Sequence, residues 1–453
     1  MPVSPARAAA FDILLRVERD SAYTSELLHS AKYDQLSTPD HALTTELVMG
    51  VLRWRSRLDD EIAETSSQPI SKLDLEILIA LRLALHQLRW LDRIPPRAAI
   101  HESVELVKRA RKRSAAPFVN AILRKFAAKA QSSPETPQSA DSPEALARAY
   151  AHPFWLVERW AKEYGLPAAK QVCEYNQSIP PTTIRLRDPA VEAELAAEGI
   201  QLAPGTLLVS ARRIQSGDIT KTQAFRAGRV VIQDEASQLV AALVGHGSQI
   251  LDCCSAPGGK TRAIADRNPD ASVTAVELHP HRARLLQTML RPKNNASGQE
   301  RSQNITILVA DARSLPARSF FDRVLADVPC SGTGTLARNP EIKWRLKPDD
   351  LPELQALQVA ILRSALTHVA PGGRLIYSTC SLEKEENEDV VNQALAGNAS
   401  FHLLDCHAEL TLLKEEGELI SLDPCTLTRG PYLRTLPGIH PCDGFFAAIL
   451  ERV

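Results

Sequence analysis

Two short segments carry the residues best suited to covalent chemistry. Residues 327–330 read Asp-Val-Pro-Cys and residues 378–381 read Ser-Thr-Cys-Ser, and each follows an apolar run that is typical of a strand. A cysteine thiolate is a strong, soft nucleophile once a cationic or amide-rich setting lowers its pKa. Cys330 and Cys380 are therefore candidates for a nucleophile and a partner that works beside it.

Such a pair suits methyl transfer to carbon 5 of a cytosine ring. That carbon is a poor nucleophile, so a thiolate must first add to carbon 6 and push electron density onto carbon 5. After the methyl group has arrived, the carbon 5 proton must leave before the adduct can break, and a second base near the ring serves this step. The residues alone leave open which cysteine attacks and which assists release.

The surroundings of these two cysteines differ from those of an ordinary buried thiol. Pro329 fixes the backbone before Cys330, and two glycines follow in a loop that a flat base could approach closely. Residues 383–389 predict a helix start just after Cys380, where amide dipoles would favour a thiolate. Four further cysteines are expected to be small buried apolar residues: Cys173, Cys406, Cys425 and Cys442.

A glycine-rich turn in residues 250–261 predicts a cofactor site. The segment reads as a strand, a turn and a helix start, and its glycines let backbone amides approach a ligand. Acidic residues end the following strands, which outlines an adenosine-shaped slot: Glu277 for the ribose hydroxyls, Asp311 for the adenine amino group and Asp327 near the reacting end. Each of the three could instead cap a helix or a turn.

Two other nucleotide sites fit this turn less well. Residues 254–261 match the tail of a phosphate-binding P-loop, but Cys254 replaces its first glycine and Pro257 stiffens a loop that needs consecutive amide donors. The G-x-G-x-x-G pattern of a nicotinamide enzyme is absent. Both classes are therefore disfavoured.

The elements that must position these residues alternate from residue 250 onward. Alternating strands and helices, including a helix over residues 354–368, predict a mainly parallel sheet whose ligands bind beyond the carboxyl ends of its strands. The expected strands cover residues 250–252, 273–278, 305–310, 324–327 and 375–378.

Before this sheet we expect an all-helical unit and a small mixed one. Helical spacing from residue 8 to 129, including a helix over 75–88 that is apolar nearly all round, predicts a bundle. Residues 131–143 are poor in large apolar side chains and predict a flexible linker. Residues 144–225 predict a small α+β module, with a helix over 146–165 and strands near 182–187, 207–209 and 230–232.

Bulk properties restrict the possible classes. The chain has 453 residues, with 53 Lys+Arg against 54 Asp+Glu and a formal net charge of −1, so any nucleic-acid surface must be a local patch. Its eight cysteines include no C-x-x-C pair, which argues against a zinc site or disulfide framework; we expect no metal and a reducing cytoplasm. Residues 1–7 lack a signal sequence and the apolar stretch 73–88 contains charges, so no membrane segment is expected.

The motifs resemble those of the Sun-type RNA (cytosine-5) methyltransferases, which use S-adenosylmethionine. Residues 252–261 are similar to the family's cofactor loop, residues 327–334 to its D-x-P-C-S-G motif and residues 377–381 to its S-T-C-S motif. The resemblance covers about residues 145–453 and implies a Rossmann-like catalytic sheet. Two further segments are similar to the family, residues 339–344 and residues 443–446.

The resemblance assigns roles that the residues left open. It implies that Cys380 is the attacking nucleophile and Cys330 assists release, with Asp327 and Lys260 in the same catalytic group. Glu277 stands where the family commonly has aspartate. The implied methyl-donor pocket consists of Cys254, Ser255, Ala256, Pro257, Gly258, Gly259, Lys260, Glu277, Asp311 and Asp327.

Residues 1–130 resemble the NusB-type helical RNA-binding domain, and its fusion to this catalytic unit implies 16S rRNA as the substrate. We therefore expect an α/β protein with four parts: a NusB-like domain (1–130), a linker (131–143), a small α+β RNA-binding domain (144–225) and a Rossmann-like catalytic domain (226–453). The basic run at 108–113 is either a solvated helix end or a phosphate-binding face. The candidates for RNA contact are Lys108, Arg109, Arg111, Lys112, Arg113, Arg185 and Arg187.

Three alternatives remain at this point. The same chemistry could act on tRNA or another RNA. A non-catalytic RNA-binding or antitermination-type factor would hold a nucleotide without turning it over. A methyltransferase for exocyclic amines would need an N-P-P-Y-type loop at residues 327–330 and no cysteine.

Overall fold

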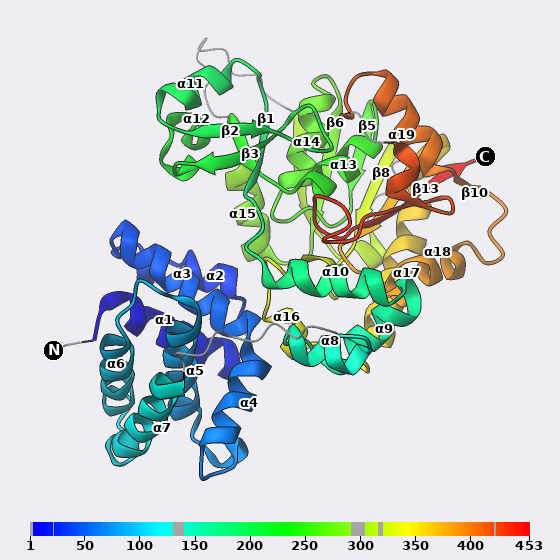
Figure 1. Cartoon of the computed structure of the whole chain (residues 1–453). Coiled ribbons are helices and arrows are strands. Elements are labelled where there is room, and N and C mark those ends of the chain that lie inside the picture. Colours follow the sequence, from blue (N-terminus) through cyan, green and yellow to red (C-terminus); the bar gives the residue numbers. More distant parts are fainter. Residues whose placement is uncertain (1–2, 21, 130–139, 291–303, 316–319, 421–422) are drawn as a thin grey trace. The chain divides into compact units, whose positions relative to one another are not determined.

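The computed structural model describes residues 3–20, 22–129, 140–290, 304–315, 320–420 and 423–453 (Figure 1). The chain forms two compact units. The first consists of residues 1–179 and 336–346, and the second of residues 180–335 and 347–453. Most of the expected linker, residues 130–139, lies outside the described residues.

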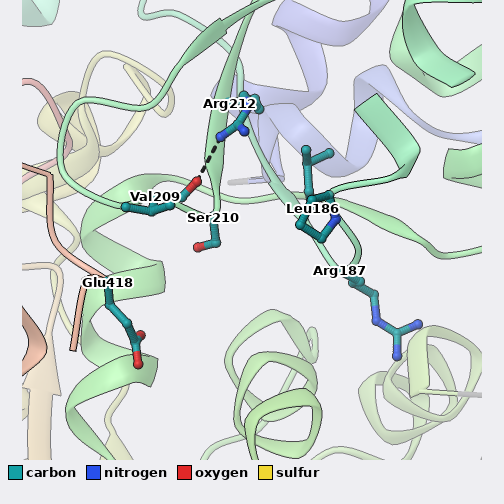
Figure 2. Close-up of a pocket in the computed structure, with 8 residues that line it drawn as sticks. Leu186, Arg187, Val209, Ser210, Arg212 and Glu418 are labelled. Atoms are coloured by element: carbon teal, nitrogen blue, oxygen red, sulfur yellow. Dashed lines mark hydrogen bonds between the residues drawn. The ribbon is translucent and has the colours of Figure 1, made fainter. Parts of the chain in front are cut away.

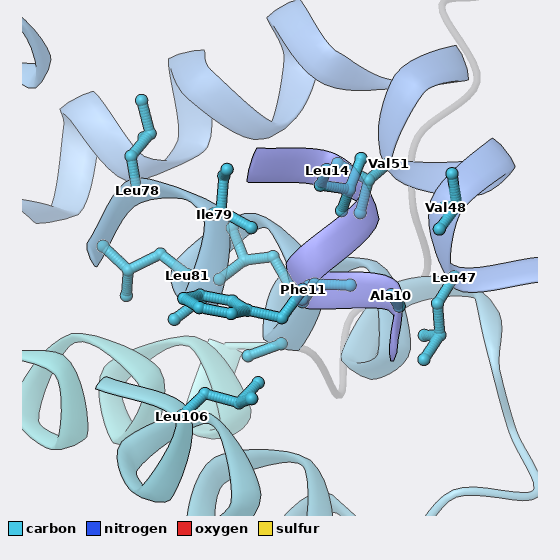
Figure 3. Packing of buried hydrophobic residues seen from close by; sticks show 14 of the residues in the cluster. Ala10, Phe11, Leu14, Leu47, Val48, Val51, Leu78, Ile79, Leu81 and Leu106 are labelled. Carbon is cyan, nitrogen blue, oxygen red and sulfur yellow. The ribbon is translucent and has the colours of Figure 1, made fainter. Parts of the chain in front are cut away.

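The first unit is helical, as predicted. Its centre is α5 (Leu75–Trp90), in which every residue from Ile77 to Gln87 is buried, as expected for a helix that is apolar nearly all round. Figure 3 shows α5 side chains packed with those of neighbouring helices. The surrounding helices are α1 (Pro5–Arg19), α2 (Thr24–Leu28), α3 (Thr38–Arg53), α4 (Arg55–Thr65), α6 (Pro96–Arg109) and α7 (Ala116–Lys129).

The helix predicted over residues 146–165 is two helices. They are α8 (Pro143–Ala149) and α9 (Phe154–Tyr164), separated where Ala151 has a φ of 48° and Pro153 caps the second helix. A positive φ cannot continue a right-handed helix, so the single-helix prediction was wrong at this point. With α10 (Leu166–Gln177) these helices belong to the first compact unit.

A segment from the middle of the chain also belongs to the first unit. It contains α16 (Ile342–Arg345), where Lys343 Nζ donates to Arg53 O at 2.9 Å and Trp344 Nε1 donates to Leu52 O at 2.6 Å. The two compact units thus do not coincide with the four domains expected from the sequence. The boundaries of those domains stay predictions.

The second unit begins with a small antiparallel sheet in the order β2-β3-β1-β4. The expected strand at 207–209 was wrong: Leu208 makes only an isolated bridge to Leu419. The N–H groups of Leu207 and Leu208 instead donate to the carboxylate of Glu235, at 2.6 and 2.9 Å, so neither is available for a ladder. The elements are β1 (Thr183–Leu186), α11 (Val191–Ala197), β2 (Gln201–Pro204), β3 (Ala211–Ser216), α12 (Gln223–Arg226) and β4 (Val230–Ile232).

The large sheet has the order β11-β12-β13-β9-β8-β5-β6-β7, with β10 paired to β13. Its parallel part confirms the five predicted strands: β5 (Gln249–Asp252), β6 (Ser272–Glu277), β7 (Asn304–Val309), β8 (Phe321–Asp327) and β9 (Val369–Thr379). The antiparallel extension was not predicted: β10 (Phe401–Leu404), β11 (Thr428–Arg429), β12 (Tyr432–Arg434) and β13 (Phe446–Arg452).

Helices cover both faces of this sheet, which gives the expected α/β architecture (Figure 1). One apolar core joins the sheet to α13 (Glu235–Leu243), α14 (Gly259–Arg267) and α19 (Cys406–Glu415). The other joins it to α17 (Asp350–Leu366) and α18 (Glu388–Leu395). The strand order reverses between β5 and β8, and in such sheets this switch point is where ligands bind. No helix among the described residues is long and apolar enough to cross a membrane.

Candidate active site

The two cysteines meet because their strands are parallel neighbours. The register of β8 and β9 pairs Asp327 with Ser378, so the loops that leave these strands begin side by side. Cys330 Sγ and Cys380 Sγ lie 3.4 Å apart, within hydrogen-bond distance for sulfur. The structure thus brings together the pair that the sequence proposed.

Cys330 is held as a thiol. The hydrogen bond to Cys380 raises the pKa of Cys330 well above its usual range, and burial and the nearby charge of Glu386 act in the same direction. A proton shared by the pair is therefore best placed on Cys330, with its S–H directed at Cys380.

A cation and two polar groups stand beside this pair. Lys260 Nζ pairs with Asp327 Oδ2 at 2.8 Å, and Ser378 Oγ donates to Asp327 Oδ1 at 2.7 Å. Burial would lower the pKa of Lys260, but the negative charge of Asp327 and its hydrogen bond, helped by Cys380 and Asp252, raise it above its usual value. Lys260 therefore remains an ammonium ion, 4.8 Å from the ring centre of Phe445.

The Cys330 loop is packed tightly against the C-terminal part of the chain. Gly334 N donates to Cys380 O at 2.9 Å, and Gly444 N donates to Gly334 O at 2.8 Å. A Cβ at Gly334 would lie 2.1 Å from Gly444 O, which no side chain tolerates. The glycine therefore permits the close approach of two backbones, rather than open space for a base.

The helix expected directly after Cys380 begins later. Residues Lys384–Glu386 form a 3₁₀ turn, and α18 starts at Glu388. Side chains occupy the backbone groups of Ser381: Asn387 Nδ2 donates to Ser381 O at 3.0 Å, and Ser381 N donates to Thr379 Oγ1 at 3.2 Å. The prediction that a helix dipole acts at Cys380 is therefore not supported by this geometry.

The glycine-rich turn has the geometry of a cofactor loop. Gly258, with a φ of 114°, precedes α14, and a Cβ there would lie 2.9 Å from Leu286 Cδ1. The Ala256–Pro257 peptide is cis. Thr261 Oγ1 donates to Asp252 Oδ2 at 2.7 Å, and burial raises the pKa of Asp252 from 3.8 to about 6, partly aided by the charge of Asp327.

Other predicted pocket residues differ in how free their polar groups are. Glu277 is buried at the end of β6; its Oε1 accepts from His279 N at 2.9 Å, and among the described residues its Oε2 has only the guanidinium of Arg282, at 3.9 Å. Asp311 accepts from Arg313 N at 2.9 Å and pairs with the Arg313 guanidinium at 2.6 Å, which lowers the pKa of Asp311. Glu277 fits a ribose diol, whereas Asp311 caps a turn and its contact with adenine stays a prediction.

Cys254 is not an additional reactive thiol. Burial, followed by the neighbouring Cys253 and acidic groups, raises the pKa of Cys254 well above its usual range. Its thiol therefore stays protonated and can only line the loop.

The predicted RNA contacts fall into both units. In the first unit Lys108 pairs with Glu105 at 2.7 Å, Arg109 with Asp12 at 3.8 Å and Lys112 with Asp74 at 2.8 Å, while Arg111 and Arg113 are exposed. In the second unit Arg185 and Arg187 both bond to Asp266, at 2.8 and 2.6 Å. RNA binding by these seven residues stays a prediction, and most of them already have an acidic partner.

Arg187 also lines a pocket of about 360 Å³ beside the small sheet. Figure 2 shows Arg187, Arg212 and Glu418 at this pocket, with Arg212 donating to Val209 O at 2.8 Å. None of the cysteines and acidic residues predicted for catalysis lines it. This pocket is therefore distinct from the candidate active site.

The remaining cysteines mostly match expectation. Cys173, Cys406 and Cys442 are buried, as predicted. Cys425 is exposed, so its prediction was wrong; its Sγ lies 3.2 Å from His407 Nε2, and with Asp423 these side chains form a group that could hold a cation. Sequence reasoning also missed Glu386, because a glutamate inside an acidic run gives no local sign of burial.

Comparison with known proteins shows the family to which the chain belongs. Residues 241–451 match the family described as 16S rRNA methyltransferase RsmB/F, and residues 4–128 match the NusB family. A protein of Bacillus subtilis named probable ribosomal RNA small subunit methyltransferase B is 34% identical over 469 residues, covering 100% of both chains. The chain belongs to the ribosomal RNA small subunit methyltransferase B family. The family's enzyme from Vibrio cholerae is 30% identical and covers 98% of this chain and 97% of its own.

Solved structures show the same fold. PH0851 aligns with a TM-score of 0.78 at 24% identity, covering 100% of both chains. A methyltransferase homologue from Pyrococcus horikoshii aligns with a TM-score of 0.55 at 24% identity, covering 70% of this chain and 100% of its own. The predicted combination of an α/β methyltransferase fold with a NusB-like helical domain is thereby confirmed.

Proposed function

We propose that this methyltransferase is a cytoplasmic enzyme that methylates carbon 5 of a cytosine in 16S rRNA through a covalent cysteine adduct. The observation that carries the proposal is the 3.4 Å separation of Cys330 Sγ and Cys380 Sγ beside the Lys260–Asp327 ion pair. Two adjacent thiols match a reaction that needs one group to bond to carbon 6 and another to assist release.

Cys380 is the nucleophile in this proposal. The raised pKa of Cys330 keeps its proton on the releasing cysteine, and Cys330 can then donate an S–H hydrogen bond that stabilises a Cys380 thiolate. The Cys380 sulfur bonds to carbon 6, and the electron pair of the carbon 5–carbon 6 double bond becomes available at carbon 5. The Lys260 ammonium group faces the negative charge that develops on the ring. Asp327 already holds this ammonium group in place, so the group need not reorganise during the reaction.

Adduct formation prepares Cys330 for its own step. The first cause of its raised pKa is the hydrogen bond to Cys380, and that cause weakens when Cys380 becomes a neutral thioether. In the proposed step Cys330 then gives up its proton to solvent. As a thiolate it accepts the carbon 5 proton; the electron pair reforms the ring double bond, and the carbon 6–sulfur bond breaks to regenerate the Cys380 thiolate.

S-adenosylmethionine is the proposed cofactor, and it supplies an electrophilic methyl group. The residues fit it: the positive φ of Gly258 permits the tight turn into α14, and Glu277 offers a buried carboxylate oxygen to the ribose hydroxyls. Residues 254–260 would hold the rest of the donor, with Asp327 at the reacting end. Asp311 would have to exchange its bond with Arg313 to reach adenine.

The 16S assignment has separate support. Relatives along the whole chain are named for the ribosomal RNA small subunit, and residues 4–128 match the NusB family. In the proposed enzyme the helical unit and the small sheet select the RNA, because sequence-specific RNA readers contact unstacked bases outside the chemistry.

Mapping of 5-methylcytosine tests the proposal. We expect the purified enzyme, given S-adenosylmethionine, to convert one cytosine of unmodified small-subunit RNA, and Cys380→Ala to convert none. Bisulfite sequencing of 16S rRNA and tRNA from the same reaction reads out the position. Methylation of tRNA with intact rRNA would overturn the substrate, and methylation of an exocyclic amine would overturn the chemistry.

A further inference from the structure

One buried carboxylate lies between the two cysteine loops. Glu386 is fully buried, and its Oε1 accepts from Ser331 N at 2.8 Å and from Gln358 Nε2 at 2.9 Å. Its Oε2 accepts from Ser381 Oγ at 2.5 Å and from Ser331 Oγ. The residue after each cysteine is therefore bonded to the same carboxylate.

These bonds leave little freedom for the two sulfur atoms. Ser331 follows Cys330 and Ser381 follows Cys380, and adjacent Cα atoms are fixed at about 3.8 Å by the peptide bond. Gln358 Nε2 also donates to Pro329 O at 2.9 Å, so Cys330 is held on both sides. Ser331 Oγ and Ser381 Oγ are themselves 3.0 Å apart, which makes the two loops one connected network.

Glu386 is itself fixed from the sheet. Tyr377 Oη, from β9, donates to Glu386 O at 2.6 Å. The position of the carboxylate is thus tied to the strand that ends at the nucleophile. No atom of Glu386 bonds to either sulfur, so its effect on their positions passes through the serines, while its charge also raises the pKa of Cys330.

A carboxylate is an unusual choice for such a place. Burying a charge is unfavourable unless it is fully hydrogen-bonded, and an apolar side chain of similar volume is often at least as stabilising. The particular advantage of a carboxylate is that its two oxygens can accept hydrogen bonds from both cysteine loops at once. This advantage concerns the relative placement of the loops more than the stability of the fold.

We propose that Glu386 is a positioning residue that holds Cys330 and Cys380 in register for adduct formation and release. The inference rests on the proposed cysteine mechanism, but its structural part can be measured without RNA. Loss of the carboxylate lets the two loops separate, and misplacement of reacting groups by about 1 Å lowers rates about 100-fold.

The test compares Glu386→Ala with Glu235→Ala as a matched control. Glu235 is equally buried and accepts the N–H groups of Thr206, Leu207 and Leu208, away from the cysteines. The first measurement gives kcat and KM for methylation. The second gives the rate at which diamide links Cys330 to Cys380, detected by peptide mass mapping in the absence of RNA and cofactor. Diamide takes up both thiol protons and two electrons, and the rate depends on how well the sulfurs are aligned and on how readily the thiols ionise. Loss of the Glu386 charge favours ionisation of Cys330, so a slower linkage in the variant reports lost alignment.

We expect Glu386→Ala to lower kcat about 100-fold with KM within about threefold, and to slow the 330–380 linkage at least about tenfold. Glu235→Ala keeps both rates at a temperature where it remains folded. If Glu386→Ala does not fold, Glu386→Gln takes its place; we expect about a tenfold loss of kcat and the same slower linkage, because one carbonyl oxygen remains.

A folded Glu386 variant with wild-type linkage rate and wild-type kcat would overturn the positioning role. Equal losses in the Glu235 control would also overturn it, since they would show a general effect of removing a buried carboxylate. Failure of the proposed function looks different: the wild-type enzyme would form no 5-methylcytosine, while the linkage rates would still respond to Glu386.

Discussion

Replacing Asp252 by asparagine should stabilise the second unit near neutral pH. Asp252 is buried at the end of β5, where burial raises its pKa from 3.8 to about 6. The folded protein therefore disfavours the ionised carboxylate, and the difference corresponds to about 3 kcal/mol above pH 6. Below pH 3.8 the carboxyl group is protonated in both states and the difference vanishes.

The neutral amide removes this penalty and keeps the shape of the side chain. We expect Asp252→Asn to raise the free energy of unfolding by about 3 kcal/mol at pH 8 and by less than about 1 kcal/mol at pH 4. All five tryptophans, at positions 54, 90, 155, 160 and 344, belong to the first unit, so fluorescence does not report on Asp252. Hydrogen exchange of β5 and α14 peptides in urea, measured by mass spectrometry, is the appropriate assay.

Asp266→Asn is a control with the opposite sign. Burial opposes ionisation of Asp266, but Arg185 and Arg187 outweigh it and lower its pKa. This variant should be less stable than the wild type at pH 8, and the loss should fade as the pH falls below 3.8. The reasoning is refuted if Asp252→Asn is no more stable than the wild type at pH 8, or if its gain does not shrink in acid.

Two further substitutions probe the tight backbone and the buried lysine. Gly334→Ala should abolish methyl transfer, because its Cβ would lie 2.1 Å from Gly444 O; donor binding measured by calorimetry should stay within about threefold, since none of the atoms nearest the added Cβ belongs to the cofactor loop. Equal losses of methyl transfer and of donor binding would contradict this expectation. Lys343→Met should raise the unfolding midpoint of the first unit at pH 7, followed by tryptophan fluorescence, because burial lowers the pKa of Lys343 well below 10.5. The gain should decrease as the pH approaches 10.5, and a loss of stability at pH 7 would contradict the assignment.

The central strands could be predicted because their signal is local. β5, β6, β8 and β9 each contain a short apolar run that ends at a polar residue, and parallel strands bring those ends together. The antiparallel strands were missed although β13 is itself an apolar run: it joins the sheet through pairing with β9, whose partner residues are more than sixty positions away. Pairing over such distances cannot be read from local periodicity.

The active site, too, could be predicted from the sequence only in part. The cysteines were found because thiols suit the chemistry, whereas Lys260 and Asp327 were placed with them by the family resemblance; the structure brings all four together. Glu386 was missed because its value lies in four bonds to residues elsewhere in the chain, which appear only after folding. The helix start after Cys380 was misplaced because the side chains of Thr379 and Asn387 bond to the backbone N–H and C=O of Ser381.

Trapping of the covalent intermediate tests the central claim most directly. The enzyme is incubated with S-adenosylmethionine and small-subunit RNA, denatured and run on a gel that separates free protein from protein bound to RNA. We predict that Cys330→Ala accumulates a denaturant-stable protein–RNA complex, because carbon 6 remains bonded to Cys380, and that Cys380→Ala forms none. A complex formed by Cys380→Ala and absent from Cys330→Ala would reverse the roles, and its absence from both would contradict the covalent mechanism.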